Sequence, residues 1–186
     1  MAVEQLIRGS RKILVQNQKI GIGIRLESTQ MDIHTVTDIA VVCKSKTKGI
    51  YTIWYGEPQD EEGSIIDETI NCNGSSWRDD DLRVSIDFTK IPKDIEKMSI
   101  ITCILWGKEL KQHYGLLEKG YMHIYSYEEK QELLEQNINC QAHKEKTGMI
   151  WAELYTYKGT WKIRAIEEAV EVKDLGQLAQ VAGSYL

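Results

Sequence analysis

Long apolar runs are missing from this 186-residue chain. No segment approaches the roughly 20 consecutive apolar residues that a helix needs to cross a bilayer. Residues 1–12 (MAVEQLIRGSRK) also lack the apolar core of a signal peptide. These absences argue against a membrane span or secretion, so we expect a cytoplasmic protein.

Proline, phenylalanine and paired cysteines are scarce. The chain has two Pro, one Phe and four Cys, and no two cysteines form a CxxC pair. Widely spaced cysteines in a cytosolic chain are expected to be reduced thiols, packed as small core residues. Five Trp and nine Tyr must then supply the aromatic packing. The length suits one domain, which we place at residues 1–186.

An excess of positive charge is also missing. Twenty-three basic residues stand against 28 acidic ones, for a net charge of −5, which argues against a nucleic-acid surface. The negative charge is concentrated in residues 57–81, which hold nine carboxylates and one base, Arg78. So much like charge is costly unless it is spread in water or neutralised by a cation. The central question is whether these acids converge on a metal.

Alternation of apolar and polar residues predicts strands through most of the chain. The predicted strands are residues 19–26, 33–42, 50–55, 82–88, 98–105 and 120–127. The two glycines of the first segment, Gly21 and Gly23, suit a close backbone approach or a bulge. Residues 149–166 form the clearest pattern, a hairpin that turns at Lys158–Gly159.

Two segments predict helices. Residues 126–136 (SYEEKQELLEQ) have helical periodicity and predict a short surface helix. Asp174 is positioned to cap a last helix through the end of the chain. Many short strands with few helices predict a mainly β fold, an antiparallel β-sandwich with a few short helices that include a C-terminal one.

Six segments, in order, resemble one known family. They are QLIRGSRKILV (5–15), IWYGEPQDEEGSI (53–65), IPKDIEKMSIITCI (91–104), QHYGLLEKGYMHIY (112–125), GMIWAELYTYKGTWKIRAI (148–166) and DLGQLAQVAGSY (174–185). Together they are similar to the TerD family of bacterial stress and tellurite-resistance proteins, whose members end in such a hairpin and a short helix. The resemblance covers nearly the whole chain.

The resemblance implies a β-sandwich that binds calcium at loops on one end and has no established catalytic activity. It also implies a role in stress and tellurite resistance, within assemblies that include an integral-membrane protein. We therefore expect a non-enzymatic protein with protein partners in such a complex, associated with the membrane through a partner. The oligomeric state is left open.

The same resemblance indicates where calcium ligands would lie, in three short motifs. The corresponding residues are Asp32 and Asp38, then Asn71 and Asn73, then Asp79, Asp80 and Asp81. His34 replaces one carboxylate of the first motif, and imidazole is a poor ligand for hard calcium. The amide oxygens of the second motif bring no charge. Calcium affinity falls as charged ligands are lost, so the site looks weakened.

Other interpretations of the acidic stretch stay open. It could be a solvated face in which Arg78 pairs with a neighbouring Asp, and the protein would then be a metal-free interaction scaffold. Hydrolytic or nucleotide-dependent chemistry would need a perturbed carboxylate pair in a concave pocket. His113 and His123 are expected at the surface or at a strand edge rather than as catalysts, and no nucleophile or phosphate-loop motif is present.

Overall fold

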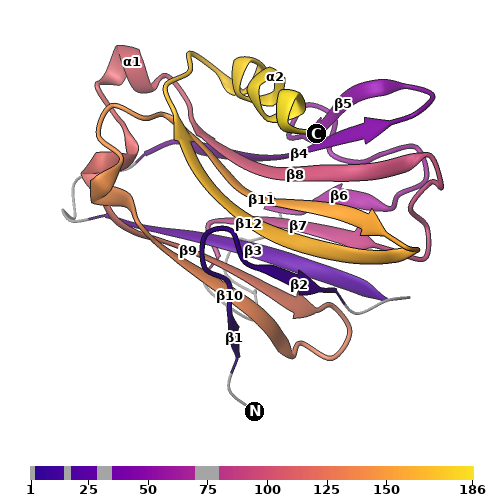
Figure 1. Ribbon diagram of the computed structural model, residues 1–186. Coiled ribbons are helices and arrows are strands. Elements are labelled where there is room, and N and C mark those ends of the chain that lie inside the picture. The colour runs from indigo at the N-terminus through magenta and orange to yellow at the C-terminus, as the bar shows by residue number, and fades with distance from the viewer. Residues whose placement is uncertain (1–2, 15–17, 29–34, 70–79) are drawn as a thin grey trace.

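Two β-sheets face each other in the computed structural model, and one helix lies across the outer side of the second sheet (Figure 1). The structure describes residues 3–14, 18–28, 35–69 and 80–186. Within these ranges, no helix is long and apolar enough to cross a membrane.

Each sheet has six strands. Sheet A contains β1 (Glu4–Gln5), β3 (Lys19–Ser28), β6 (Ile65–Asp67), β7 (Leu82–Asp87), β9 (Leu117–Ser126) and β10 (Glu132–Asn139). Sheet B contains β2 (Arg11–Ile13), β4 (Thr37–Ser45), β5 (Gly49–Trp54), β8 (Ile95–Ile104), β11 (Gly148–Tyr157) and β12 (Thr160–Val170). The helices are α1 (Gly107–Leu110) and α2 (Leu175–Tyr185), with 3₁₀ turns η2 (Tyr114–Leu116) and η3 (Cys140–Ala142).

The strand order is β1-β10-β9-β3-β7-β6 in sheet A and β2-β12-β11-β8-β4-β5 in sheet B. All of these neighbouring strands pair antiparallel except the short β1, which runs parallel to β10. The predicted antiparallel sandwich is confirmed. The hairpin of β11 and β12 is also confirmed, with positive φ at both Lys158 and Gly159 in its turn.

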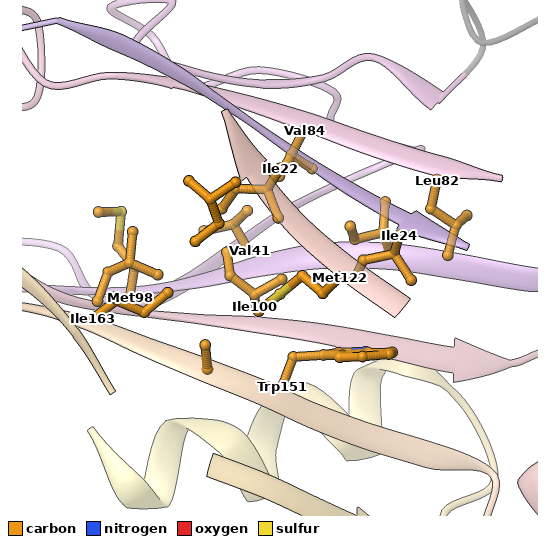
Figure 2. Close-up of a cluster of buried hydrophobic side chains, with 14 of the residues drawn as sticks. Ile22, Ile24, Val41, Leu82, Val84, Met98, Ile100, Met122, Trp151 and Ile163 are labelled. Carbon is orange, nitrogen blue, oxygen red and sulfur yellow. The ribbon is translucent and has the colours of Figure 1, made fainter. Parts of the chain in front are cut away.

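The core fills the space between the sheets (Figure 2). Ile22 and Ile24 of β3 project inward from sheet A, because alternate residues of a strand face the same side. Ile100 and Trp151 project from sheet B to meet them. The buried indole N–H of Trp151 donates a hydrogen bond to Oγ1 of Thr102 at 2.8 Å, so this ring has a polar partner within the core.

Helix α2 covers part of the outer face of sheet B. Leu175, Leu178 and Ala182 point down onto this face. They pack against outward-facing residues of β4, β8 and β11, namely Ala40, Val42, Ile101 and Ile150. The side chain of Asp174 accepts a hydrogen bond from the Gln177 amide at 2.8 Å, which confirms the predicted cap. Among the described residues, α2 packs mainly on β4, β8 and β11, away from the edge strand β2 (Figure 1).

The predicted helix at residues 126–136 is wrong. The chain makes a turn after Ser126 and then forms β10, which pairs with β9. Leu134, Gln136 and Ile138 alternate as buried residues along β10. Glu, Gln and Leu favour helices in isolation, but the open edge of β9 offers backbone hydrogen bonds and a core face to cover. Tertiary pairing therefore overrides the local preference.

Candidate functional site

Asp80 lies just before β7 and is held in a buried network on the outer side of sheet A. Its side chain is only 3% exposed. Its Oδ1 lies 2.8 Å from Nε2 of His123, and its Oδ2 accepts hydrogen bonds from Arg83, at 2.8 Å from Nη2 and 3.3 Å from Nε. Both carboxylate oxygens are therefore used by protein donors.

His123 lies on β9 between two carboxylates. Its Nδ1 is 3.2 Å from Oε1 of Glu132, opposite the contact with Asp80. The ring is fully buried, so the expectation of a surface or edge position for His123 is wrong. It is also stacked between the rings of Tyr121 and Tyr125, with centroids 5.6 and 5.2 Å away. These four contacts together hold the imidazole ring of His123 in one position.

The space for this network comes from two glycines on β3. A Cβ on Gly23 would lie 2.3 Å from Nε2 of His123 and 2.4 Å from Oδ2 of Asp80. A Cβ on Gly21 would lie 2.1 Å from the ring of Tyr125. No side chain fits at either position, which confirms the close backbone approach that the sequence predicted.

The network also sets the charge state of Asp80. Burial by itself raises a carboxyl pKa, but the hydrogen bonds and positive charge of His123 and Arg83 outweigh it and lower the pKa of Asp80. The carboxylate is therefore stabilised as an anion by hydrogen-bond partners within the protein. The sequence had suggested Arg78 for this role, but Arg78 lies outside the described residues.

Asp81 is held differently. Its Oδ2 accepts a hydrogen bond from the Leu26 amide at 2.7 Å, which links the start of β7 to the end of β3. Its pKa is raised, chiefly by partial burial of the carboxyl, although the Leu26 amide and Arg25 act in the opposite direction. The other carboxylate oxygen of Asp81, Oδ1, takes no part in the hydrogen bond with the Leu26 amide.

Asp38 and Asp67 lie on opposite sheets, and the negative charge of Asp67 acts on the Asp38 carboxyl. Asp38 is near the start of β4 in sheet B, and Asp67 ends β6 in sheet A. Burial, together with the negative charge of Asp67, raises the pKa of Asp38 from 3.8 to about 6, despite a hydrogen bond from the Ile39 amide. Oδ1 of Asp67 accepts from the Thr69 amide at 2.9 Å, whereas its Oδ2 is buried with no hydrogen-bond partner among the described residues.

This pair has the chemistry of a cation site. Two nearby carboxylates repel each other, and a buried oxygen without a donor is costly, so a hard cation would relieve both penalties. Calcium prefers such oxygen ligands. Within the described part of the chain, however, no three His, Cys, Asp or Glu side chains gather as a metal-binding group. Two carboxylates alone would supply only part of the oxygen ligands that calcium prefers.

Asp60 and Glu68, two further acids of the described acidic stretch, are used in a turn and in contacts with Tyr127 and Lys19. Asp60 accepts hydrogen bonds from the amides of Ser64 and Ile65, at 2.6 and 2.8 Å, and so closes the turn before β6. Glu68 accepts a hydrogen bond from Tyr127 Oη at 3.0 Å and lies 3.5 Å from Lys19 Nζ. These carboxylates support the fold locally, and they are not free ligands.

The residues proposed from sequence are placed as follows. Asp38, Asp80 and Asp81 are described, and they occupy three different environments. The remaining four proposed ligands, Asp32, Asn71, Asn73 and Asp79, lie outside the described residues. Sequence reasoning missed Asp67, His123 and Glu132. The signal for His123 was present: it alternates with Tyr121 and Tyr125 on a strand that pairs with Gly21 and Gly23.

Comparison with known proteins gives the family. The family model described as the TerD domain matches residues 1–181. Over 133 residues the chain is 26% identical to general stress protein 16U of Bacillus subtilis, which covers 72% of this chain and 66% of that protein. Over 134 residues it is 26% identical to the tellurium resistance protein TerD of an Alcaligenes species, with the same coverage of 72% and 66%. The chain thus matches slightly less than two thirds of the length of these relatives.

A solved structure agrees in fold. The structure of a homologue of telluride resistance protein TerD from Streptomyces coelicolor A3(2) superimposes with a TM-score of 0.67. It covers 89% of this chain and 97% of that one, at 13% sequence identity. The names of these proteins describe stress and resistance proteins and not enzymes. With a family model that matches residues 1–181 and a sandwich shared with a TerD homologue, this chain belongs to the TerD family.

Proposed function

We propose that this protein is a non-catalytic, calcium-responsive member of a bacterial stress or tellurite-resistance system. The observation that carries the proposal is the pair of Asp38 and Asp67. The raised pKa of Asp38 and the unpartnered Oδ2 of Asp67 both indicate a place where a cation would be stabilising. The names of the relatives support the stress and resistance role.

The described residues divide into those that suit calcium and those that do not. Asp38 and Asp67 would hold the ion, and Asp81 has a carboxylate oxygen beyond the one bound to Leu26. Asp80 is unsuited, because Arg83 and His123 already neutralise it. Calcium usually takes six to eight oxygen ligands, so the acids and amides proposed from sequence in residues 29–34 and 70–79 would have to complete the site.

Bound calcium would supply positive charge near Asp38 and Asp67. That charge would offset the repulsion of Asp38 and Asp67 and favour the folded arrangement of the surrounding loops. The consequence is a domain whose stability and surface at this end depend on calcium. This surface would bind the partner proteins of a stress complex. The protein would associate with the membrane through one of these partners.

Thermal unfolding in excess calcium against chelator tests this proposal, with magnesium as the ionic control. A ligand at 100 times its dissociation constant adds about 2.7 kcal/mol to the folded state. At about 2–4 °C per kcal/mol for a chain of this size, the midpoint should rise by roughly 5–10 °C. The rise should be lost in Asp38→Asn and Asp67→Asn and kept in Glu62→Gln, which removes an exposed charge elsewhere in the acidic stretch.

The second candidate is a metal-free interaction scaffold, favoured by the ion pairs of Asp80. There the protein's own Arg83 and His123 supply the positive charge that a metal would otherwise bring. No midpoint shift at millimolar calcium would support this scaffold and reject the calcium-responsive role. If calcium raises the unfolding midpoint of Asp38→Asn and Asp67→Asn as much as that of the unmodified protein, calcium binds elsewhere.

A further inference from the structure

A basic groove lies on the outer face of sheet B, lined by residues of β2, β8, β11 and β12. Its volume is about 560 Å³. Its polar lining includes Arg11, Lys97, Lys162, Arg164 and a single carboxylate, Glu153. The local net charge is therefore three positive, in a chain whose net charge is −5. The groove is far from Asp38, which pairs with Cys103 at the opposite end of β8 from Lys97.

The strand register places like charges next to each other in this groove. Arg11 of β2 lies directly opposite Arg164 of β12. On the other side, Arg164 is opposite Glu153 of β11. Two cations directly opposite across antiparallel strands destabilise a sheet. A bound anion would remove this cost.

One carboxylate must serve several cations. Oε1 of Glu153 lies 3.3 Å from Nζ of Lys97, and Oε2 lies 3.1 Å from Nη2 of Arg164. Glu153 is only 6% exposed, so its charge is committed to these two partners. Among the described residues, Arg11 and Lys162 have no carboxylate within ion-pair distance.

One hydrogen-bond donor in the groove is also left without an acceptor among the described residues. Nε of Arg164 is buried and has no hydrogen-bond partner in the part of the chain that the structure describes. A buried donor without a partner is costly and is uncommon in folded proteins. Tyr155 and Tyr157 line the same groove, and Nζ of Lys162 lies 4.6 Å from the ring centroid of Tyr157. This contact keeps the ammonium group close to the groove.

We propose that this groove binds a small molecule that carries two or more linked phosphates. Guanidinium groups recognise phosphate oxygens through paired, charge-assisted hydrogen bonds, and Arg11 and Arg164 provide two such groups side by side. A volume of about 560 Å³ is in the range of small-molecule sites and holds more than a single phosphate ion. The tyrosine rings provide a surface for an organic group attached to the phosphates. This site is independent of the calcium proposal.

Isothermal titration calorimetry with inorganic pyrophosphate, in calcium-free buffer, tests the site. The double variant Arg11→Gln/Lys162→Gln removes the two cations that have no ion-pair partner. The matched control Arg8→Gln/Lys46→Gln makes the same charge change at exposed ion pairs elsewhere. We expect one binding site, weakened at least tenfold in the groove variant, since each charge-assisted hydrogen bond contributes about 1.5–3 kcal/mol, roughly tenfold or more in affinity.

The control variant should bind within about twofold of the unmodified protein, since exposed ion pairs contribute little. Without ligand, the groove variant should unfold at a temperature close to that of the unmodified protein, because relief of the repulsion at Arg11 offsets the loss of the Lys162 contact with the Tyr157 ring. No binding of millimolar pyrophosphate, or equal weakening in both variants, would overturn the proposal. So would binding to phosphatidylcholine vesicles that contain phosphatidic acid without any binding of pyrophosphate, which would assign the face to a lipid surface.

Discussion

Replacing Asp38 with Asn should stabilise the metal-free protein at neutral pH. The folded protein raises the pKa of Asp38 from 3.8 to about 6, so keeping this carboxyl ionised in the folded state has a cost. A difference of about two pKa units corresponds to roughly 3 kcal/mol. Asp38 is only half-buried, and solvent screening reduces this to about 1–2 kcal/mol. Asn has a carbonyl oxygen that can still accept the hydrogen bond from the Ile39 amide.

The sign of this effect depends on pH. A carboxyl whose pKa is raised on folding binds more protons in the folded state, so stability falls as pH rises from about 4 to about 6 and then levels. The Asp38→Asn protein has no carboxyl at this position, so it does not lose stability in this way as pH rises. Its advantage should be absent near pH 4 and complete above pH 6. At 2–4 °C per kcal/mol, it corresponds to a midpoint about 2–8 °C higher at pH 7.

Thermal unfolding in chelator, at several pH values from 4 to 7.5, measures the effect. Asp67→Asn is the companion variant, because it removes the neighbouring charge and should reproduce only the electrostatic part of the gain. Calcium should reverse the order of stability, since only the unmodified protein retains both carboxylates. Two results would contradict this reasoning: Asp38→Asn is less stable than the unmodified protein in chelator, or its advantage does not change with pH. Either result would mean that the ionised Asp38 carboxyl does not destabilise the folded protein.

Three further substitutions test the buried contacts by denaturant unfolding. Gly23→Ala should cost at least about 1–3 kcal/mol, because its Cβ would displace His123 or Asp80. Asp80→Asn should cost about 3–5 kcal/mol at neutral pH, because it removes the buried anion that pairs with Arg83 and contacts His123. Since the pKa of Asp80 is lowered, this difference should persist above pH 4 and shrink as pH falls through the folded pKa. Trp151→Phe should cost about 1–3 kcal/mol, through the lost hydrogen bond to Thr102 and the space left by the smaller ring.

Controls separate these effects from general damage. Gly176→Ala lies in α2, where a Cβ meets only Asp174 Oδ1 at 3.3 Å, so it should be neutral or stabilising. A Gly23→Ala protein with unchanged stability would show that the network has room to shift. A cost for Asp80→Asn that stays constant down to pH 3 would show that its ionised form is not what stabilises the fold.

Much of the architecture could be predicted from sequence because strand periodicity is a local property. Alternate residues face the same side of a strand whatever its partner is, so alternation predicted β3, β7, β9 and the β11–β12 hairpin. The cap at Asp174 is local as well, since it joins residues three positions apart. The family resemblance rested on these same segments, and the match over residues 1–181 confirms it.

The exception was β10, whose composition favours a helix. Its structure depends on an open edge of β9 that no window of neighbouring residues reveals. The candidate site depends on distant contacts in the same way. Asp80 contacts His123, which lies 43 residues away in the sequence. The pKa of Asp38 is raised in part by the negative charge of an acid on the other sheet.

The sequence by itself therefore determined the family, most of the strands, the final helix and the concentration of negative charge. Only the tertiary structure decided which acids pair with donors of the protein, and that Asp67 Oδ2 is buried without a hydrogen-bond partner among the described residues. It also decided that four cations from three strands share one groove with a single carboxylate. The physical reason is that pKa shifts, burial and ion pairing depend on distances in space, and strand pairing sets those distances between residues far apart in the chain.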